Sequence, residues 1–77
     1  MEFGQAFGQV LKAHRKAAGF SQEELAHRAC MHSTAISLYE RGLRQPTLHT
    51  VFNLSTVLGV QPSQIVMEVE ALRPELS

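Results

Sequence analysis

Residues 21–42 contain two short helix patterns separated by only a few residues, and no other segment limits the fold as strongly. Ser21 is suited to cap the first helix, and Glu24 three positions later predicts a reciprocal capping box. Gly42 suits the left-handed residue that ends the second helix. The apolar stripes are narrow: Leu25, Ala26 and Ala29, then Ala35, Ile36 and Tyr39. Helices this short cannot share a core by themselves. They must cross steeply and rest on other helices, which leaves the outer face of the second helix free.

A steeply crossed pair of this kind is the helix-turn-helix, whose second helix enters the DNA major groove. Further motifs follow in a set order and spacing: Arg15 and Gly19, Ser21–Gln22, Leu25–Ala26, Ile36–Ser37, Tyr39–Gly42, Pro46, and Leu58–Gly59–Val60. In this order they resemble the phage-repressor and Cro-type (XRE-type) helix-turn-helix family, from about Phe7 to Ile65. The resemblance implies a compact all-α, five-helix domain of the lambda-repressor-like type. It also implies a DNA-binding transcriptional regulator, repressor or activator or both, of the size of restriction–modification controllers and small phage repressors.

Apolar periodicity and stop signals predict five helices, over about 3–18, 22–29, 33–41, 47–58 and 62–72. Thr47 is the expected N-cap of the fourth helix, and Pro62 suits the first position of the fifth. No alternating strand pattern competes. We therefore expect one domain over 1–77, with the helix-turn-helix at about 21–42 and with residues 47–72 forming core and dimer interface.

Charge is balanced overall but unevenly distributed. Residues 1–44 carry six Lys or Arg against four Glu, and residues 45–77 carry one against three. This polarity permits a front half that faces DNA. The single Cys30 excludes an internal disulfide and fits a reducing cytoplasm. The sequence shows neither a secretory signal pattern nor an apolar run near the roughly 20 residues of a membrane span. We expect a cytoplasmic protein that does not bind membranes.

The second short helix supplies the expected contacts with double-stranded DNA. Its outward N-terminal side chains are the candidates for base contact: His32, Ser33, Thr34, Ser37 and Leu38. Leu38 could pack on a thymine methyl group or fold back on the domain. Phosphate contacts are expected from Gln22, Arg41 and Arg44. The alternative for all of these residues is ordinary solvated surface.

The resemblance also assigns a structural role to Arg15 and Glu40. In related proteins the matching residues form a partly buried ion pair that joins the first helix to the recognition helix. An Arg fork can meet a carboxylate with two hydrogen bonds, so such a pair would fix the position of the recognition helix.

No Asp, Glu, Lys or Arg occurs between Arg44 and Glu68. A helix on the surface of a small monomer usually has a charged outer face, so this stretch predicts a second buried face in a homodimer. The expected interface residues are Phe52, Val57, Val60, Ile65, Val66 and Val69. Alternatively, the fourth helix is simply the central core helix, with an uncharged outer face. The alternative function is a protein-interaction module, such as an antitoxin-like partner, that uses this surface.

Two residues depart from the family pattern. Cys30 stands where a turn glycine is usual, and a positive φ there would be strained. His32 replaces the usual Ser or Thr cap. With His27, these residues also raise a metal-sensing alternative, but zinc needs about four converging ligands. We expect no metal, no cofactor, no small-molecule ligand and no enzyme activity, since no pocket or Gly-rich phosphate loop is evident.

Overall fold

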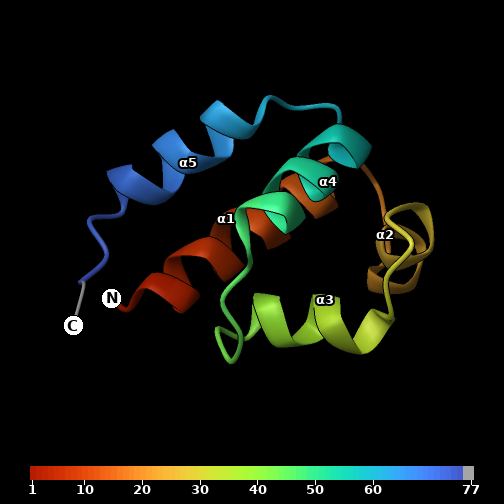
Figure 1. Ribbon diagram of the computed structural model, residues 1–77, viewed down its shortest axis with the longest axis horizontal. Helices are drawn as coiled ribbons and strands as arrows, with labels where there is room; N and C mark the ends of the chain where they lie inside the picture. Colours follow the sequence, from red (N-terminus) through yellow and green to blue (C-terminus); the bar gives the residue numbers. More distant parts are fainter. Residues whose placement is uncertain (76–77) are drawn as a thin grey trace.

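The computed structural model describes residues 1–75, and these fold into five α-helices (Figure 1). The helices are α1 (Phe3–Ala17), α2 (Gln22–Arg28), α3 (Ser33–Glu40), α4 (Leu48–Leu58) and α5 (Pro62–Ala71). Each predicted boundary lies within one residue of the observed one, because cap residues and stop glycines mark both ends of most helices. The all-α class is confirmed.

Helix α1 lies in the middle of the fold, between α3 on one side and α5 on the other (Figure 1). Helix α2 packs against α3 and α4, and α4 packs against α5. The core contains thirteen buried apolar residues from all five helices and the turn after α2: Ala6, Phe7, Val10, Leu11, Leu25, Ala26, Ala29, Ile36, Tyr39, Val51, Leu54, Ile65 and Val69. Among the helices of residues 1–75, α3 therefore packs closely only on α1 and α2.

The backbones of α1 and α3 approach each other unusually closely. A Cβ atom built on Gly8 would lie 2.4 Å from the carbonyl oxygen of Tyr39, and one on Gly4 would lie 2.9 Å from that of Gly42. Side chains cannot occupy either place unless the backbone moves. The two glycines thus let the C-terminal end of α3 rest directly on α1.

Four helices end in the same hydrogen-bonded turn, but the turn after α2 lacks the usual glycine. The residues at positive φ in the other three turns are Gly19, Gly42 and Gly59. After α2 that place is taken by Cys30, with a φ of 57°. Its N–H donates to His27 O (3.2 Å), and the Met31 N–H donates to Ala26 O (2.8 Å), which is the Schellman pattern. The backbone strain expected from a side chain at positive φ is therefore present at Cys30.

The cap of α2 is simpler than predicted. Ser21 Oγ accepts the backbone N–H of Glu24 at 3.0 Å, as expected. The Glu24 carboxylate, however, accepts from Arg28 Nη2 at 3.2 Å, one turn later on the same helix. The other half of the predicted capping box, a hydrogen bond from the Ser21 N–H to the Glu24 carboxylate, is therefore wrong. Arg28, an opposite charge four residues on, competes for that carboxylate. At α3, His32 is the N-cap and its side chain makes no cap hydrogen bond.

The longest of the helices in residues 1–75, α1, has 15 residues, and none of the five is both long and apolar enough to span a bilayer.

Replacing Cys30 by Gly is expected to stabilise the protein by about 0.5–1 kcal/mol, because glycine adopts positive φ without a Cβ clash and this gain exceeds its entropic cost. The thermal unfolding midpoint should rise by about 4 °C for a domain of this size. Ala29→Gly, one residue earlier at negative φ, is the matched control and should lower the midpoint. A lower midpoint for Cys30→Gly would contradict the strain argument.

Candidate nucleic-acid interface

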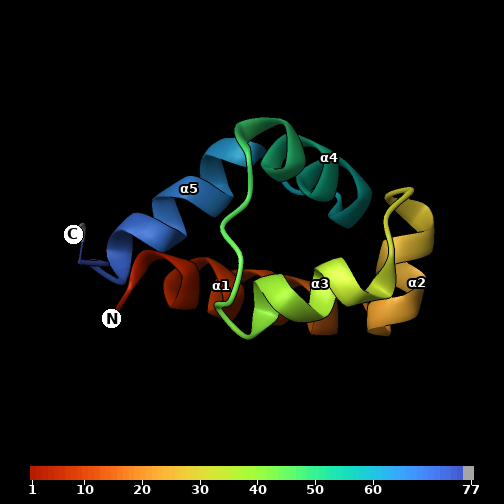
Figure 2. The ribbon, with the colours of Figure 1, turned by 60° about the horizontal axis from the view of Figure 1, so that its bottom comes forward.

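Helix α3 buries one side and leaves the other uncovered. Ile36 is fully buried and Tyr39 is 6% exposed. The Tyr39 ring meets Phe7 of α1 edge to face, with ring centroids 5.9 Å apart. Turned so that α3 comes forward, the fold has no other helix over the outer side of α3 (Figure 2). The condition for DNA access, a bare outer face, is met.

The residues expected to contact bases lie on or beside this outer face. His32, Ser33 and Thr34 are exposed at the beginning of α3, while Ser37 and Leu38 are half-buried farther along. Leu38 is thus partly folded back on the domain. Hydroxyl and imidazole groups at the N-terminal end of the helix are available as donors and acceptors toward a groove.

The cations expected at phosphates flank the far end of α3. Arg41 is its C-cap residue, and Arg44 lies in the following loop; both are exposed. Leu43 between them is 65% exposed. Two exposed positive charges beside an uncovered helix suit the backbone of a duplex on its flank.

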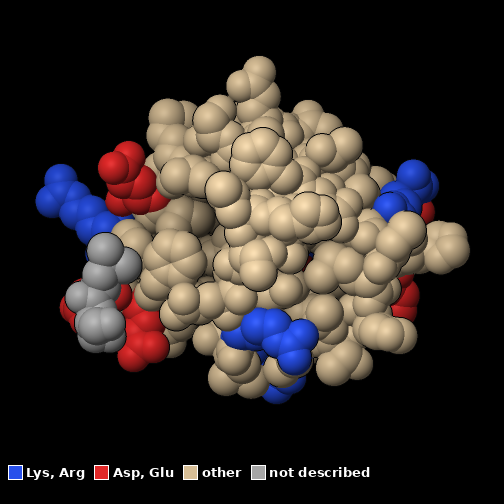
Figure 3. Space-filling view, viewed as in Figure 1, with Lys and Arg blue, Asp and Glu red and all other residues tan. Residues whose placement is uncertain are grey.

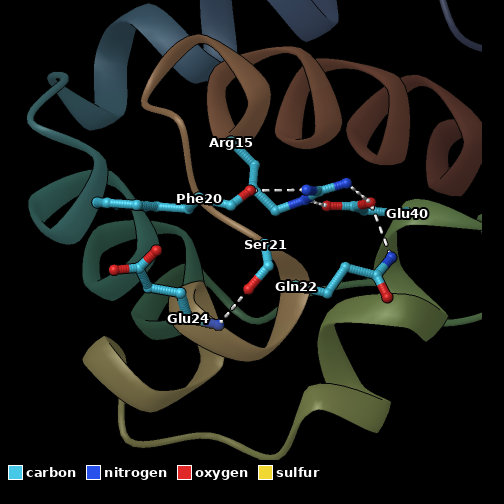
Figure 4. A network of polar contacts seen from close by, with 6 residues as sticks. All are labelled: Arg15, Phe20, Ser21, Gln22, Glu24 and Glu40. Carbon is cyan, nitrogen blue, oxygen red and sulfur yellow. Dashed lines mark hydrogen bonds and ion pairs between the residues drawn. The ribbon is translucent and has the colours of Figure 1, made fainter.

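Arg15 and Glu40 meet between α1 and α3 (Figure 4). Arg15 Nε and Nη2 donate to the two carboxylate oxygens of Glu40, at 2.6 and 3.0 Å. Arg15 Nη1 donates to the carbonyl oxygen of Phe20 at 2.8 Å. The hydrogen bonds that Arg15 donates to Glu40 raise the pKa of Arg15 above its ordinary value. With side chains 10% and 3% exposed, the pair is shielded from solvent.

Gln22 joins this network, which sequence reasoning did not foresee. Its Nε2 donates to Glu40 Oε1 at 3.0 Å, and its own carbonyl oxygen points away from Glu40 (Figure 4). Gln22 was expected only at a phosphate. No local pattern reveals the contact, because 18 positions separate the two residues.

The predicted dimer interface needs correction. Ile65 and Val69 are 3% and 6% exposed, so they belong to the protomer's own core and form only the floor of a groove of about 170 Å³. Val57 and Val60 are half-buried against that core. Of the six predicted residues, Phe52 (53%) and Val66 (52%) are exposed. When a helix has apolar residues on two sides, the sequence repeat does not indicate which side is buried in the protomer's own core.

Two exposed residues that were not predicted complete an apolar surface. Leu48 is 69% exposed and Met67 is 60% exposed. We call the four exposed apolar side chains of α4 and α5, which are Leu48, Phe52, Val66 and Met67, the α4–α5 patch; Leu48 and Val66 line the same groove. In the space-filling view the middle of this face carries no Lys, Arg, Asp or Glu, and the charged side chains lie around its edge (Figure 3).

Residues 1–75 contain no group of three or more His, Cys, Asp or Glu side chains placed to hold a metal ion. His27, Cys30 and His32 are therefore not brought together in such a group. His14 instead lies with its Nε2 2.8 Å from Glu68 Oε1, which links α1 to α5. Hydrogen bonds from Gln64 and then from His14 lower the pKa of Glu68.

Comparisons with known proteins agree with this geometry. A helix-turn-helix family model matches residues 11–65. Control protein C.BamHI of Bacillus amyloliquefaciens is 39% identical over 61 residues, which cover 78% of this chain and 75% of that protein. The restriction–modification controller protein C.AhdI of Aeromonas hydrophila has a crystal structure that is similar with a TM-score of 0.78 at 34% identity, over 80% of this chain and 94% of that chain.

A second solved structure, the clp gene regulator ClgR of Corynebacterium glutamicum, has a TM-score of 0.88. The match covers 94% of this chain and 77% of the ClgR chain, but at 21% identity it supports the fold alone. The family model, by contrast, spans all of α2, α3 and α4, with the second half of α1 and the beginning of α5. The chain belongs to the XRE-type helix-turn-helix family of DNA-binding transcriptional regulators.

Proposed function

We propose that this protein binds a roughly palindromic operator as a homodimer and regulates transcription from it. The observation that carries the proposal is the orientation of α3. Its apolar side is buried on α1 and α2, and its N-terminal polar side, with Ser33 and Thr34, is bare. The similarity to control proteins at 39% and 34% identity supports a regulatory role.

DNA contacts would divide between two groups. Thr34 and Ser33, with His32, Ser37 and Leu38 beside them, would face base edges in the major groove. Arg41, Arg44 and the free donor of the Gln22 amide would hold phosphates on either side. The chain has no net charge, so these few cations would provide most of the attraction, and nonspecific binding would be weak.

The α4–α5 patch would form the contact between two protomers. Four large apolar side chains are at least 52% exposed there, and single chains rarely leave such a cluster open to water. Two-fold symmetry would place the recognition helices about 34 Å apart, in successive major grooves. The protein-interaction alternative uses the same patch for a different protein, so self-association separates the two functions.

Selection from a random oligonucleotide pool tests the whole proposal. A two-fold symmetric consensus with half-sites about 10 base pairs apart is expected. Recovery of no consensus by a protein that is folded and active for self-association would refute operator recognition.

Thr34→Ala and Arg44→Ala should weaken binding in different ways. Loss of the Thr34 hydroxyl should lower affinity for the selected site by about 3–10-fold for each protomer of the dimer, the worth of one hydrogen bond per half-site, and leave nonspecific affinity unchanged. Loss of Arg44 removes one phosphate contact from each protomer, so it should lower both affinities and reduce the slope of log affinity against log salt by about 1.8 per dimer. Fluorescence anisotropy at several salt concentrations measures both quantities. Ser63→Ala on α5 is the control, and equal behaviour of all three variants would contradict the assignment.

Glu40→Ala should destabilise the fold by about 3–5 kcal/mol, because it leaves the buried Arg15 charge without its partner. Thermal unfolding and DNA affinity should both decline. Glu23→Ala, an exposed carboxylate on α2, should change neither stability nor fold. Full stability and full DNA affinity in Glu40→Ala would show that the pair does not hold α3.

Met67→Lys should weaken self-association at least tenfold without unfolding the chain, because the side chain is 60% exposed and the charge would enter an apolar interface. Sedimentation equilibrium of the parent and the variant gives the dissociation constants. Ala13→Lys, exposed on α1, is the matched control. A parent protein that remains monomeric at every concentration would favour the protein-interaction alternative.

A further inference from the structure

Helices α2 and α3 are fixed to each other at two places. One is covalent: the end of α2 passes into α3 through residues 29–32. The other is at the opposite ends, where the first residue of α2, Gln22, donates to the last residue of α3, Glu40, at 3.0 Å. Within residues 1–75 this is the one side-chain hydrogen bond that connects the two helices. A pair of short helices held at both ends has little freedom to change its crossing angle.

The acceptor of this bond is itself rigid. The Glu40 side chain is 3% exposed and receives two further hydrogen bonds from Arg15, which also binds the Phe20 carbonyl just before α2. Gln22 is half-buried and lies beside the chain that runs from Phe20 into α2. Three segments, α1, the start of α2 and the end of α3, thus meet around one carboxylate (Figure 4).

We propose that Gln22 is a positioning residue for sequence recognition: through Glu40 it sets the angle of α3 relative to α2, and with it the reach of the side chains at the beginning of α3. This inference rests on the proposed function, since it concerns how that DNA contact discriminates sequences. It goes beyond a phosphate contact. A group that only holds a phosphate contributes to every DNA sequence alike, whereas a group that orients α3 contributes only where bases are read.

The distinguishing quantity is the specificity ratio, the affinity for the selected operator divided by that for an unrelated duplex of equal length. A variant that is partly unfolded loses both affinities in proportion, so the ratio does not respond to the folded fraction. Gln22→Ala is expected to lower the ratio about fivefold. Gln22→Glu keeps the side-chain length but removes the donor and places a second carboxylate against Glu40, so it should lower the ratio further. Thermal unfolding of each variant accompanies the titrations.

Glu23→Gln is the matched control. Glu23 is exposed beside Gln22 in the first turn of α2 and makes no side-chain hydrogen bond in residues 1–75, and its substitution changes the charge by the same amount in the opposite sense. It should raise both affinities together and leave the ratio unchanged. A control that shifts the ratio as far as Gln22→Glu would overturn the proposal in favour of a simple charge effect.

A double-mutant cycle with Thr34→Ala completes the test. If Gln22 positions α3, the loss in operator affinity in the double variant should be at least threefold smaller than the product of the single losses, because a misplaced helix no longer benefits from Thr34. Independent effects, or an equal loss on operator and unrelated DNA in Gln22→Ala, would overturn the positioning role. If the parent protein itself discriminates no sequence, the proposed function fails, and that outcome is distinct from a failure of Gln22 alone.

Discussion

The whole DNA-facing side of the molecule depends on how α3 is attached to α1. The attachment has two components that reinforce each other: the contact of the two backbones at Gly4 and Gly8, and the shielded Arg15–Glu40 pair. The first brings the helices within backbone contact, and the second fixes their relative rotation, because a guanidinium and a carboxylate bind through two hydrogen bonds in one plane. Desolvation offsets much of the Coulombic gain in such a pair. Its main effect is therefore on geometry rather than on net stability.

A second consequence follows from the uneven distribution of polar groups. Charged residues concentrate in the first 44 positions, and the α4–α5 patch is uncharged. Helix α3 packs on α1 and α2 and makes no extensive contact with α4 or α5. The surface suited to DNA and the surface suited to a second protomer thus belong to different helices of the same small core. Each can be altered without removing a contact that the other needs.

Local signals in the sequence were sufficient for the elements of the fold and insufficient for their mutual contacts. The residues that mark helix ends act within a few positions of where they stand in the sequence; they are Ser21, Thr47, Pro62 and the stop glycines. The helix ends were therefore predicted within one residue. The strain at Cys30 was also predicted, because the turn geometry is local.

The predictions failed where the residues alone had to indicate which distant group a side chain meets. Gln22 donates to a residue 18 positions away, and the burial of Ile65 and Val69 depends on where α1 lies. Gly4 and Gly8 were visible in the sequence as a pair one helical turn apart, yet their purpose depends on the tertiary approach of α3. The Arg15–Glu40 contact, which spans 25 positions, was anticipated only through resemblance to relatives.

The side chains at the beginning of α3 take no part in the hydrogen bonds that hold the described fold together. His32, Ser33 and Thr34 are exposed and make no side-chain hydrogen bond to the rest of residues 1–75, so the fold does not depend on their identity. Under the proposed function, exchanging them would change the DNA sequence that the protein recognises while its scaffold stays intact. A lineage could therefore acquire new target sequences by a few substitutions at one helix end, with no need for compensating changes in the interior.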